Sequence, residues 1–198
     1  MPALTTADTA SIHRQAVGER LTSMGCRITP QNVRGMLELV LPQHRNILHI
    51  QAAQIAIEVG YLLAQMVYPW PNWRTAQLDF RESYPAYIKY GAYPILRRLP
   101  WQFLRPARKA ALAAEVTQLR TRVIGDLRRF QVELRPHTGH EYTLFMIPHE
   151  LNRPQYVTVG YLMAQFIYPR VIWHTTPLRL ETDTSENIVC AVAMVSER

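Results

Sequence analysis

Cysteine and glycine are both scarce in this sequence of 198 residues. The two cysteines, Cys26 and Cys190, lie far apart, so they form neither a disulfide framework nor the closely spaced ligand pairs of a structural zinc site. Such sparse cysteine is typical of a reducing compartment, and we expect a cytoplasmic protein. The eight glycines occur singly, so the chain has no glycine-rich phosphate loop and no dinucleotide-binding fingerprint. We therefore expect no cofactor.

The chain also lacks a long apolar run. No stretch approaches the roughly 18 consecutive apolar residues of a membrane-spanning helix. The first residues do not combine a basic segment with an apolar one, as a secretory signal does. We expect no membrane span. Hydrophobic residues still make up 48% of the sequence, which is enough for a core. The formal net charge of +7 permits contact with an anionic partner but identifies none.

The sequence does contain one stretch that occurs twice. VGYLLAQMVYP begins at Val59, and VGYLMAQFIYP begins 100 residues later at Val159. Over 22 aligned residues 11 pairs are identical without a gap, whereas chance would give about one or two. The spacing is too long for one unit of a solenoid. We interpret the repeat as a tandem duplication of a small domain, with a first module at 1–98 and a second at 99–198.

Each module begins with a predicted helix, and the second continues with a predicted hairpin. Apolar residues recur at helical spacing over 8–24 and again over 106–129. Period-two alternation follows in FQVEL at 130–134 and YTLFMI at 142–147, on either side of a turn, which predicts a β-hairpin.

The start of the first module allows two predictions. A similar hairpin fits residues 37–50, with a turn near their middle. The alternative is a helix that begins at Thr29 and Pro30, which are a favourable N-cap and N1 pair. The sequence alone leaves both predictions open.

The first part of the repeated stretch is predicted to be a strand, and LLAQMV and LMAQFI after it fit either a helix turn or a continuing strand. Gly60 and Gly160 lie within it, and a glycine disfavours a helix interior by roughly 1 kcal/mol relative to alanine. Alternating and β-branched residues around each glycine favour a strand. A Tyr-Pro corner ends the stretch, and a further strand is expected from Trp73 and from Trp173. The predicted module is an α+β fold, a helix on one face of an antiparallel β-meander.

This order resembles the ubiquitin-conjugating-enzyme fold and its non-catalytic RWD relatives. The likeness is clearest over 106–195, in the helix up to Arg129, the segments FQVEL, YTLFMI and YVTVGYL, and the Tyr-Pro corner of YPRVIWH. In catalytic members of the family a cysteine follows the meander, and Cys190 stands at that place. The His-Pro-Asn motif of those enzymes is absent from this chain. The resemblance implies an RWD-like binding module, with a degenerate enzyme using Cys190 as nucleophile as an alternative.

The candidate reactive side chains all have structural explanations. Cys190 lies in an apolar run that predicts a buried final strand, where a thiol is inert. Cys26 follows a helix end, which favours an exposed linker thiol. Three histidines fall in or beside a predicted turn, where solvated side chains are commoner than metal ligands: His137, His140 and His149. We expect no metal site.

Cations are concentrated in one segment at 97–129. The candidate nucleic-acid contacts in it are Arg97, Arg98, Arg105, Arg108, Lys109, Arg120 and Arg122. Such a segment can neutralise phosphates, and aromatic rings within it can stack on bases. The structural alternative is a solvated helix face preceded by a linker.

Four tyrosines recur at a spacing of three residues just before the basic segment: Tyr84, Tyr87, Tyr90 and Tyr93. They predict either one face of a short helix or an irregular aromatic loop. Packing between the two modules would account for them. An exposed aromatic patch, together with Trp101 and Phe103, would instead mark a surface for a partner.

With no catalytic constellation in the chain, we expect a non-enzymatic protein-binding or scaffold module with a protein partner. A nucleic-acid-binding protein that uses the segment 97–129 is the alternative, and the oligomeric state is left open.

Overall fold

The computed structural model describes residues 6–31, 36–44, 46–69, 73, 76–93, 106–136 and 142–195. Their first half runs through α1 (Thr6–Ser23), β1 (Arg27–Gln31), β2 (Met36–Leu41), α2 (His49–Val67), β3 (Asp79–Ser83) and β4 (Tyr87–Ala92). Their second half runs through α3 (Pro106–Arg129), β5 (Glu133–Pro136), β6 (Thr143–Pro148), α4 (Arg153–Ile167), the short 3-10 helix η3 (Val171–His174), β7 (Arg179–Thr182) and β8 (Ile188–Ala193). The predicted α+β class is confirmed, and the α and β elements of the two halves follow the same order.

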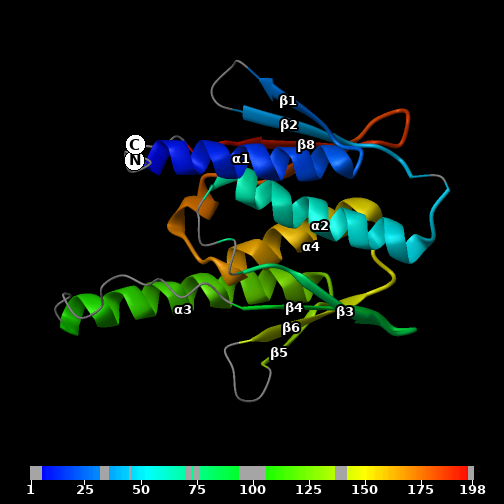
Figure 1. Ribbon diagram of the computed structural model, residues 1–198. Coiled ribbons are helices and arrows are strands. Elements are labelled where there is room, and N and C mark those ends of the chain that lie inside the picture. The colour runs from blue at the N-terminus through cyan, green and yellow to red at the C-terminus, as the bar shows by residue number, and fades with distance from the viewer. Residues whose placement is uncertain are drawn as a thin grey trace.

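Each of the two antiparallel sheets combines strands from both halves. Sheet A has the order β1-β2-β8-β7, and sheet B has the order β3-β4-β6-β5. The halves are joined by β2 with β8, where Leu39 lies opposite Cys190, and by β4 with β6, where Tyr90 lies opposite Phe145. In Figure 1 the sheets lie on opposite sides of helices α2 and α4, with α1 beside α2 and α3 beside α4.

The inner faces of both sheets and the two central helices bury one continuous core. Period-two alternation along the strands sends every second side chain inward. The inner positions of sheet A are Leu37, Leu39, Leu41, Ile188, Cys190 and Val192, and those of sheet B include Ile88, Tyr90, Phe145 and Ile147. Because this core draws on residues from both halves, each half buries its strands against the other.

Helices α2 and α4 cross at a pair of glycines. A Cβ atom added to Gly60 would lie 2.0 Å from the carbonyl oxygen of Val157, and one added to Gly160 would lie 1.9 Å from the carbonyl oxygen of Ile57. Real Cβ atoms do not approach backbone oxygens so closely, so only glycine fits at either position. The two contacts are reciprocal, which places the crossing on an approximate twofold axis between the halves.

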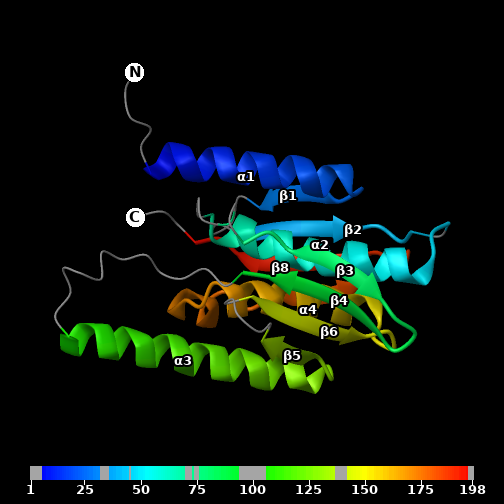
Figure 2. The same ribbon diagram turned by 60° about the horizontal axis from the view of Figure 1, so that its bottom comes forward.

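Each Tyr-Pro corner after α2 and α4 is closed by a tryptophan of its own half and packs against the tryptophan of the other half. The indole Nε1 of Trp73 donates to the Tyr68 carbonyl at 2.9 Å, and that of Trp173 donates to the Tyr168 carbonyl at 2.8 Å. Each indole also packs on the tyrosine of the other half, with ring centroids 5.4 Å apart for Trp73 and Tyr168 and 6.1 Å apart for Trp173 and Tyr68. Figure 2 shows α2 and α4 from a second side, with the strands of both sheets around them.

The prediction that the repeated stretch begins as a strand is wrong, because the stretch forms the C-terminal parts of α2 and α4. Of the two alternatives for LLAQMV and LMAQFI, the helical one is correct. The helical cost of Gly60 and Gly160 is offset by the close crossing that they permit. A capping box also starts α4: the Asn152 side chain accepts from the Gln155 backbone N–H, and the Gln155 side chain accepts from the Asn152 N–H. Tertiary packing thus overrides the strand propensity of the β-branched residues.

The other local predictions have mixed outcomes. The helices predicted over 8–24 and 106–129 and the hairpin formed by β5 and β6 are confirmed. In the first half both predictions are wrong. The hairpin is β1 with β2, so Thr29 and Pro30 lie in an edge strand, where proline is tolerated, and residues 49–50 already belong to α2. The strands expected from Trp73 and Trp173 begin only at Asp79 and Arg179.

Replacing Gly60 or Gly160 with alanine should lower the free energy of unfolding by about 2–3 kcal/mol, because the new methyl group overlaps a fixed carbonyl and forces the helices apart. Urea denaturation followed by circular dichroism measures this loss. The matched control is Gly125→Ala in α3, where no described atom lies within 4 Å of an added Cβ. That change should be neutral or stabilise by up to about 1 kcal/mol. A similar loss at all three glycines would contradict the role of the crossing.

Candidate functional site

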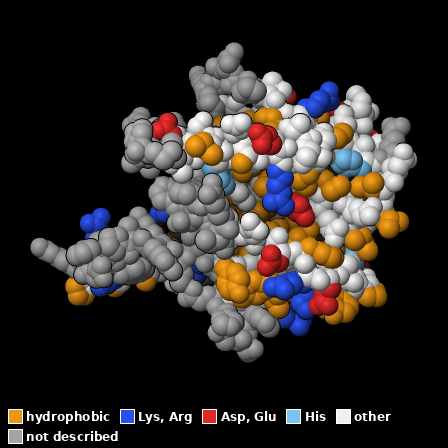
Figure 3. Space-filling view, in the orientation of Figure 1, with side chains coloured by type: hydrophobic (Ala, Val, Ile, Leu, Met, Phe, Trp, Pro, Cys, Tyr) orange, Lys and Arg blue, Asp and Glu red, His pale blue; other side chains and the backbone are white. Residues whose placement is uncertain are grey.

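Aromatic side chains distinguish sheet B from sheet A. The four strands of sheet A contain no aromatic residue. Figure 3 shows hydrophobic side chains beside cationic and acidic ones in the lower part of the view, where sheet B lies. Three rings in the β3–β4 region are open to solvent: Phe80 is 45%, Tyr84 is 42% and Tyr93 is 50% exposed.

Tyr142 lies on the outer face of sheet B, just before β6. It lies over Gly91 so closely that a Cβ at that position would be 2.1 Å from the phenol oxygen, so the ring needs a glycine beneath it. The hydroxyl accepts from Nε of Arg81 at 2.8 Å and donates to a carboxylate oxygen of Asp79 at 3.1 Å. Tyr93 packs against the same ring, with centroids 4.6 Å apart. The buried Tyr142 therefore holds an exposed guanidinium and an exposed ring in fixed positions.

A second cluster lies beside it, between β3 and β4. Glu82 accepts from Lys89 and from the Tyr84 hydroxyl, the latter at 2.6 Å. These hydrogen bonds lower the pKa of Glu82, and the bond to Glu82 raises the pKa of Lys89. Lys89 also lies 5.9 Å from the centre of the Tyr84 ring. The cluster stays charged at neutral pH, with its aromatic ring beside the cation.

The two clusters enclose a surface hollow of about 280 Å³. It is lined by Arg81, Glu82, Lys89, Tyr142 and Leu144. Arg81 and Lys89 can hold an anionic group there if it shares them with the resident carboxylates of Asp79 and Glu82. The leucine and the neighbouring exposed rings offer apolar contact beside it. Hydrogen bonds to charged donors are stronger than neutral ones, so a carboxylate is the simplest group to suit the hollow.

The tyrosines predicted to bind a partner are divided between two faces. A helix or irregular loop was expected, but β3 and β4 form a hairpin, and period two puts Tyr87 on the outer face and Tyr90 on the inner one. Tyr90 is fully buried, whereas Tyr84 and Tyr93 are exposed. The remaining candidates, Trp101 and Phe103, lie outside the described residues. Arg81, Lys89 and Tyr142 could not be grouped from the sequence, because only the pairing of β4 with β6 brings Tyr142 to the hollow that the other two line.

The basic residues within α3 do not share one face of the helix. Arg120 and Arg122 are two positions apart, about 200° around the helix. Nε of Arg120 donates to the Phe166 carbonyl at 3.3 Å, and Arg122 contacts His174. Arg108 is exposed and Lys109 is half-buried near the start of the helix. Arg97, Arg98 and Arg105 lie outside the described residues.

Both thiols are buried. Cys190 is fully buried in β8, as predicted, but the prediction that Cys26 is exposed is wrong, because it packs into the core at 3% exposure. Burial raises the pKa of each thiol to about 12. A thiol is nucleophilic only as a thiolate, so these properties disfavour Cys190 as a nucleophile.

His149 contacts the Tyr84 carbonyl at 2.7 Å, and His137 and His140 lie outside the described residues. Within the described part of the chain no three His, Cys, Asp or Glu residues are grouped as metal ligands.

One described helix, α2, is long and apolar enough by composition to cross a membrane, and 67% of its most apolar window is buried inside the protein.

Comparison of the chain with protein-family models, with curated proteins and with solved structures finds no match. The likeness to the ubiquitin-conjugating and RWD folds stays a prediction, and the segment YVTVGYL that it took as a strand belongs to α4.

Native protein should resist thiol alkylation at about pH 8, because a pKa of about 12 leaves roughly one thiol in ten thousand as thiolate, and burial blocks the reagent. Iodoacetamide labelling followed by mass spectrometry should modify Cys26 and Cys190 only after unfolding in urea. Labelling of Cys190 in the native chain at the rate of a free cysteine would contradict its burial.

Stability should fall as the pH rises above about 9. The buried thiols, and Tyr156 and Tyr168 with pKa values raised to about 12, are neutral in the folded chain but ionise at lower pH when unfolded. Their contribution is therefore complete below the unfolded pKa values and is lost as the pH approaches 12. Urea midpoints measured between pH 8 and pH 11 should decrease steadily. A constant midpoint would contradict this account.

Proposed function

We propose that this chain is a non-enzymatic protein-binding module that holds an acidic segment of a partner protein on the outer face of sheet B. The observation that carries the proposal is the hollow between Arg81, Lys89 and Tyr142, with exposed tyrosine rings beside it. The burial of both thiols supports a role without chemistry.

The composition of this face suits a protein partner. Tyrosine and arginine are enriched among residues that dominate binding energy at interfaces. An exposed ring or guanidinium costs less to immobilise when it is already held, and Tyr142 fixes both Arg81 and Tyr93 before any partner arrives. The strands of sheet A contain arginine but no aromatic side chain, so that face lacks this combination.

The charge of the chain favours an acidic partner. Asp79 and Glu82 each pair with one cation of the hollow, so the hollow itself is close to neutral. The formal net charge of +7 attracts an acidic partner over a longer range, and salt weakens that attraction. Once docked, a carboxylate can share Arg81 and Lys89 with the resident carboxylates. We thus expect specificity from the hollow and rings, and the association rate to depend on ionic strength.

Nucleic-acid binding by the basic segment is less well supported. Arg120 and Arg122 point in different directions and already contact α4 and η3. We therefore include binding of nucleic acid as an alternative outcome of the binding experiment.

Selection of a random peptide library on the purified full chain at low ionic strength tests the proposal. We expect enriched peptides that combine Asp or Glu with an aromatic or aliphatic residue. A synthetic peptide of that kind should bind at least about tenfold more weakly to Arg81→Ala and to Lys89→Ala, because each change removes a charged hydrogen-bond donor.

The matched control is Arg179→Ala, which removes an exposed arginine from sheet A and should leave peptide binding unchanged. Failure to enrich acidic peptides would contradict the proposal, and so would an equal loss of binding in the sheet A control. Binding of random single-stranded DNA that Arg108→Ala weakens and Arg81→Ala leaves unchanged would favour the nucleic-acid alternative.

A further inference from the structure

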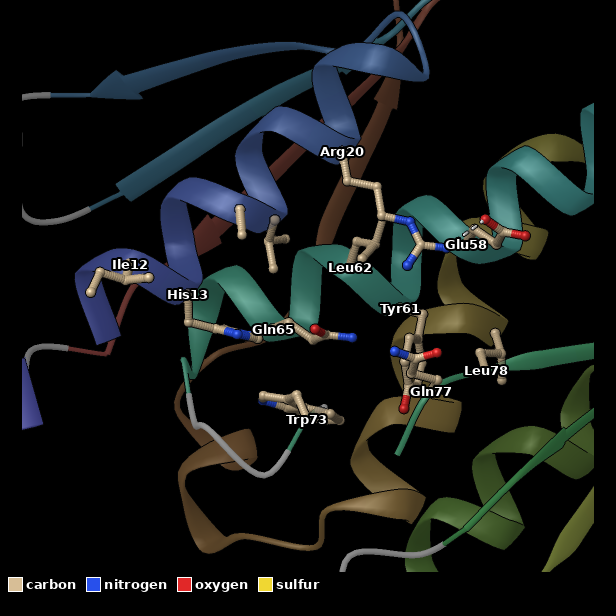
Figure 4. A pocket seen from close by; sticks show the side chains of 12 residues that line it. Ile12, His13, Arg20, Glu58, Tyr61, Leu62, Gln65, Trp73, Gln77 and Leu78 are labelled. Atoms are coloured by element: carbon tan, nitrogen blue, oxygen red, sulfur yellow. Dashed lines mark hydrogen bonds and ion pairs between the residues drawn. The ribbon is translucent and has the colours of Figure 1, made fainter. Parts of the chain in front are cut away.

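A cavity of about 220 Å³ lies between α1, α2 and the segment after α2, away from the face proposed to bind a partner. Figure 4 shows the side chains around it. Ala16 and Val17 of α1 and Leu62 of α2 give it an apolar wall, and Tyr61 and Trp73 supply aromatic ones. Its polar lining comes from His13, Arg20, Glu58, Gln65 and Gln77.

Gln65 is the buried polar group of this cavity. The residue is 7% exposed, and no hydrogen bond joins its amide to another described residue. In Figure 4 the amide points into the space between Leu62, Tyr61 and Trp73. Because the amide lines the cavity and is not engaged by a described side chain or backbone group, a ligand that both accepts from and donates to Gln65 can pair with it on entering.

The second half provides an internal comparison. The backbone N–H of Cys26 donates to the Leu21 carbonyl, and that of Val132 donates to the Leu127 carbonyl, which aligns α1 with α3. Under this alignment Val17 corresponds to Val123, and the repeat pairs Gln65 with Gln165 and Trp73 with Trp173. The space between α3 and α4 therefore matches the cavity between α1 and α2.

That matching space is almost filled. Its volume is about 40 Å³. The residue at the place of Ala16 is Arg122, whose guanidinium contacts His174 across the space. Leu119 stands at the place of His13. The helices α1 and α2 thus enclose an open cavity, whereas the matching helices α3 and α4 enclose a nearly filled one. The larger volume between α1 and α2 therefore comes from particular side chains and is not dictated by the fold.

We propose that this cavity binds a small uncharged heterocycle whose edge carries a hydrogen-bond donor next to an acceptor, as in a lactam or a nucleobase. A cavity of about 150 Å³ suffices for benzene, so 220 Å³ admits one or two fused rings. The Gln65 amide offers one acceptor and two donors, which matches such an edge. The cations near the mouth do not call for an anion, because Arg20 pairs with Glu58 at 3.5 Å.

Ligand-detected NMR titrations with uracil, hypoxanthine and indole test the proposal. Uracil or hypoxanthine should bind saturably with a Kd below about 1 mM. Indole has a similar shape but lacks the acceptor, so it should bind at least about tenfold more weakly than the better of the other two. Gln65→Leu keeps the volume of the side chain and removes the amide, and should abolish the preference over indole.

Two further variants make the test specific. Ala16→Arg places at this position the residue type that the second half has at Arg122, so its long side chain should fill the cavity and abolish binding of every probe. Gln165→Leu makes the Gln65 change in the closed half and should leave binding unaltered. Circular dichroism confirms that each variant is folded. The proposal is overturned if neither uracil nor hypoxanthine binds the unmodified chain, or if binding is unchanged in both Gln65→Leu and Ala16→Arg.

Discussion

The close crossing of α2 and α4 is the contact on which the rest of the structure depends. Gly60 and Gly160 let each helix backbone touch the other, which brings the two halves into one core. At that distance β2 reaches β8 and β4 reaches β6, so both sheets are completed across the same axis. Larger residues at the crossing would separate the helices and with them the inner faces of both sheets. The free energy of folding is therefore shared between the halves.

Much of the local structure could be predicted from the sequence, because it depends on neighbouring residues. The outer helices, the hairpin after α3 and the buried position of Cys190 follow from hydrophobic spacing alone. The central helices could not be predicted in this way, since Gly60 and Gly160 count against a helix unless the crossing is known. One local signal was available: Asn152 and Gln155 form a capping box before α4.

The candidate site was less predictable than the fold, because it is built from long-range contacts. Tyr142 meets Arg81 only where β6 of one half pairs with β4 of the other, and no spacing along the chain encodes that neighbour. The spacing of three between Tyr84, Tyr87 and Tyr90 predicted either a short helix or an irregular loop. In the β3–β4 hairpin Tyr87 instead lies on the outer face and Tyr90 on the inner face. Cys26 is buried for a similar reason, since the start of β1 packs into a core shared by both halves.

A single chain with two similar halves can change one half and keep the other. In a symmetric homodimer every substitution appears twice, so a new surface on one sheet is copied onto its mate. Here sheet B carries the aromatic residues while sheet A has none in its strands, and Ala16 leaves open a space that Arg122 closes on the other side. The residues that must match across the axis are the glycines and the Tyr-Pro and Trp contacts of the central helices. Function is therefore expected at positions where the halves differ, because the shared positions are already required by the crossing.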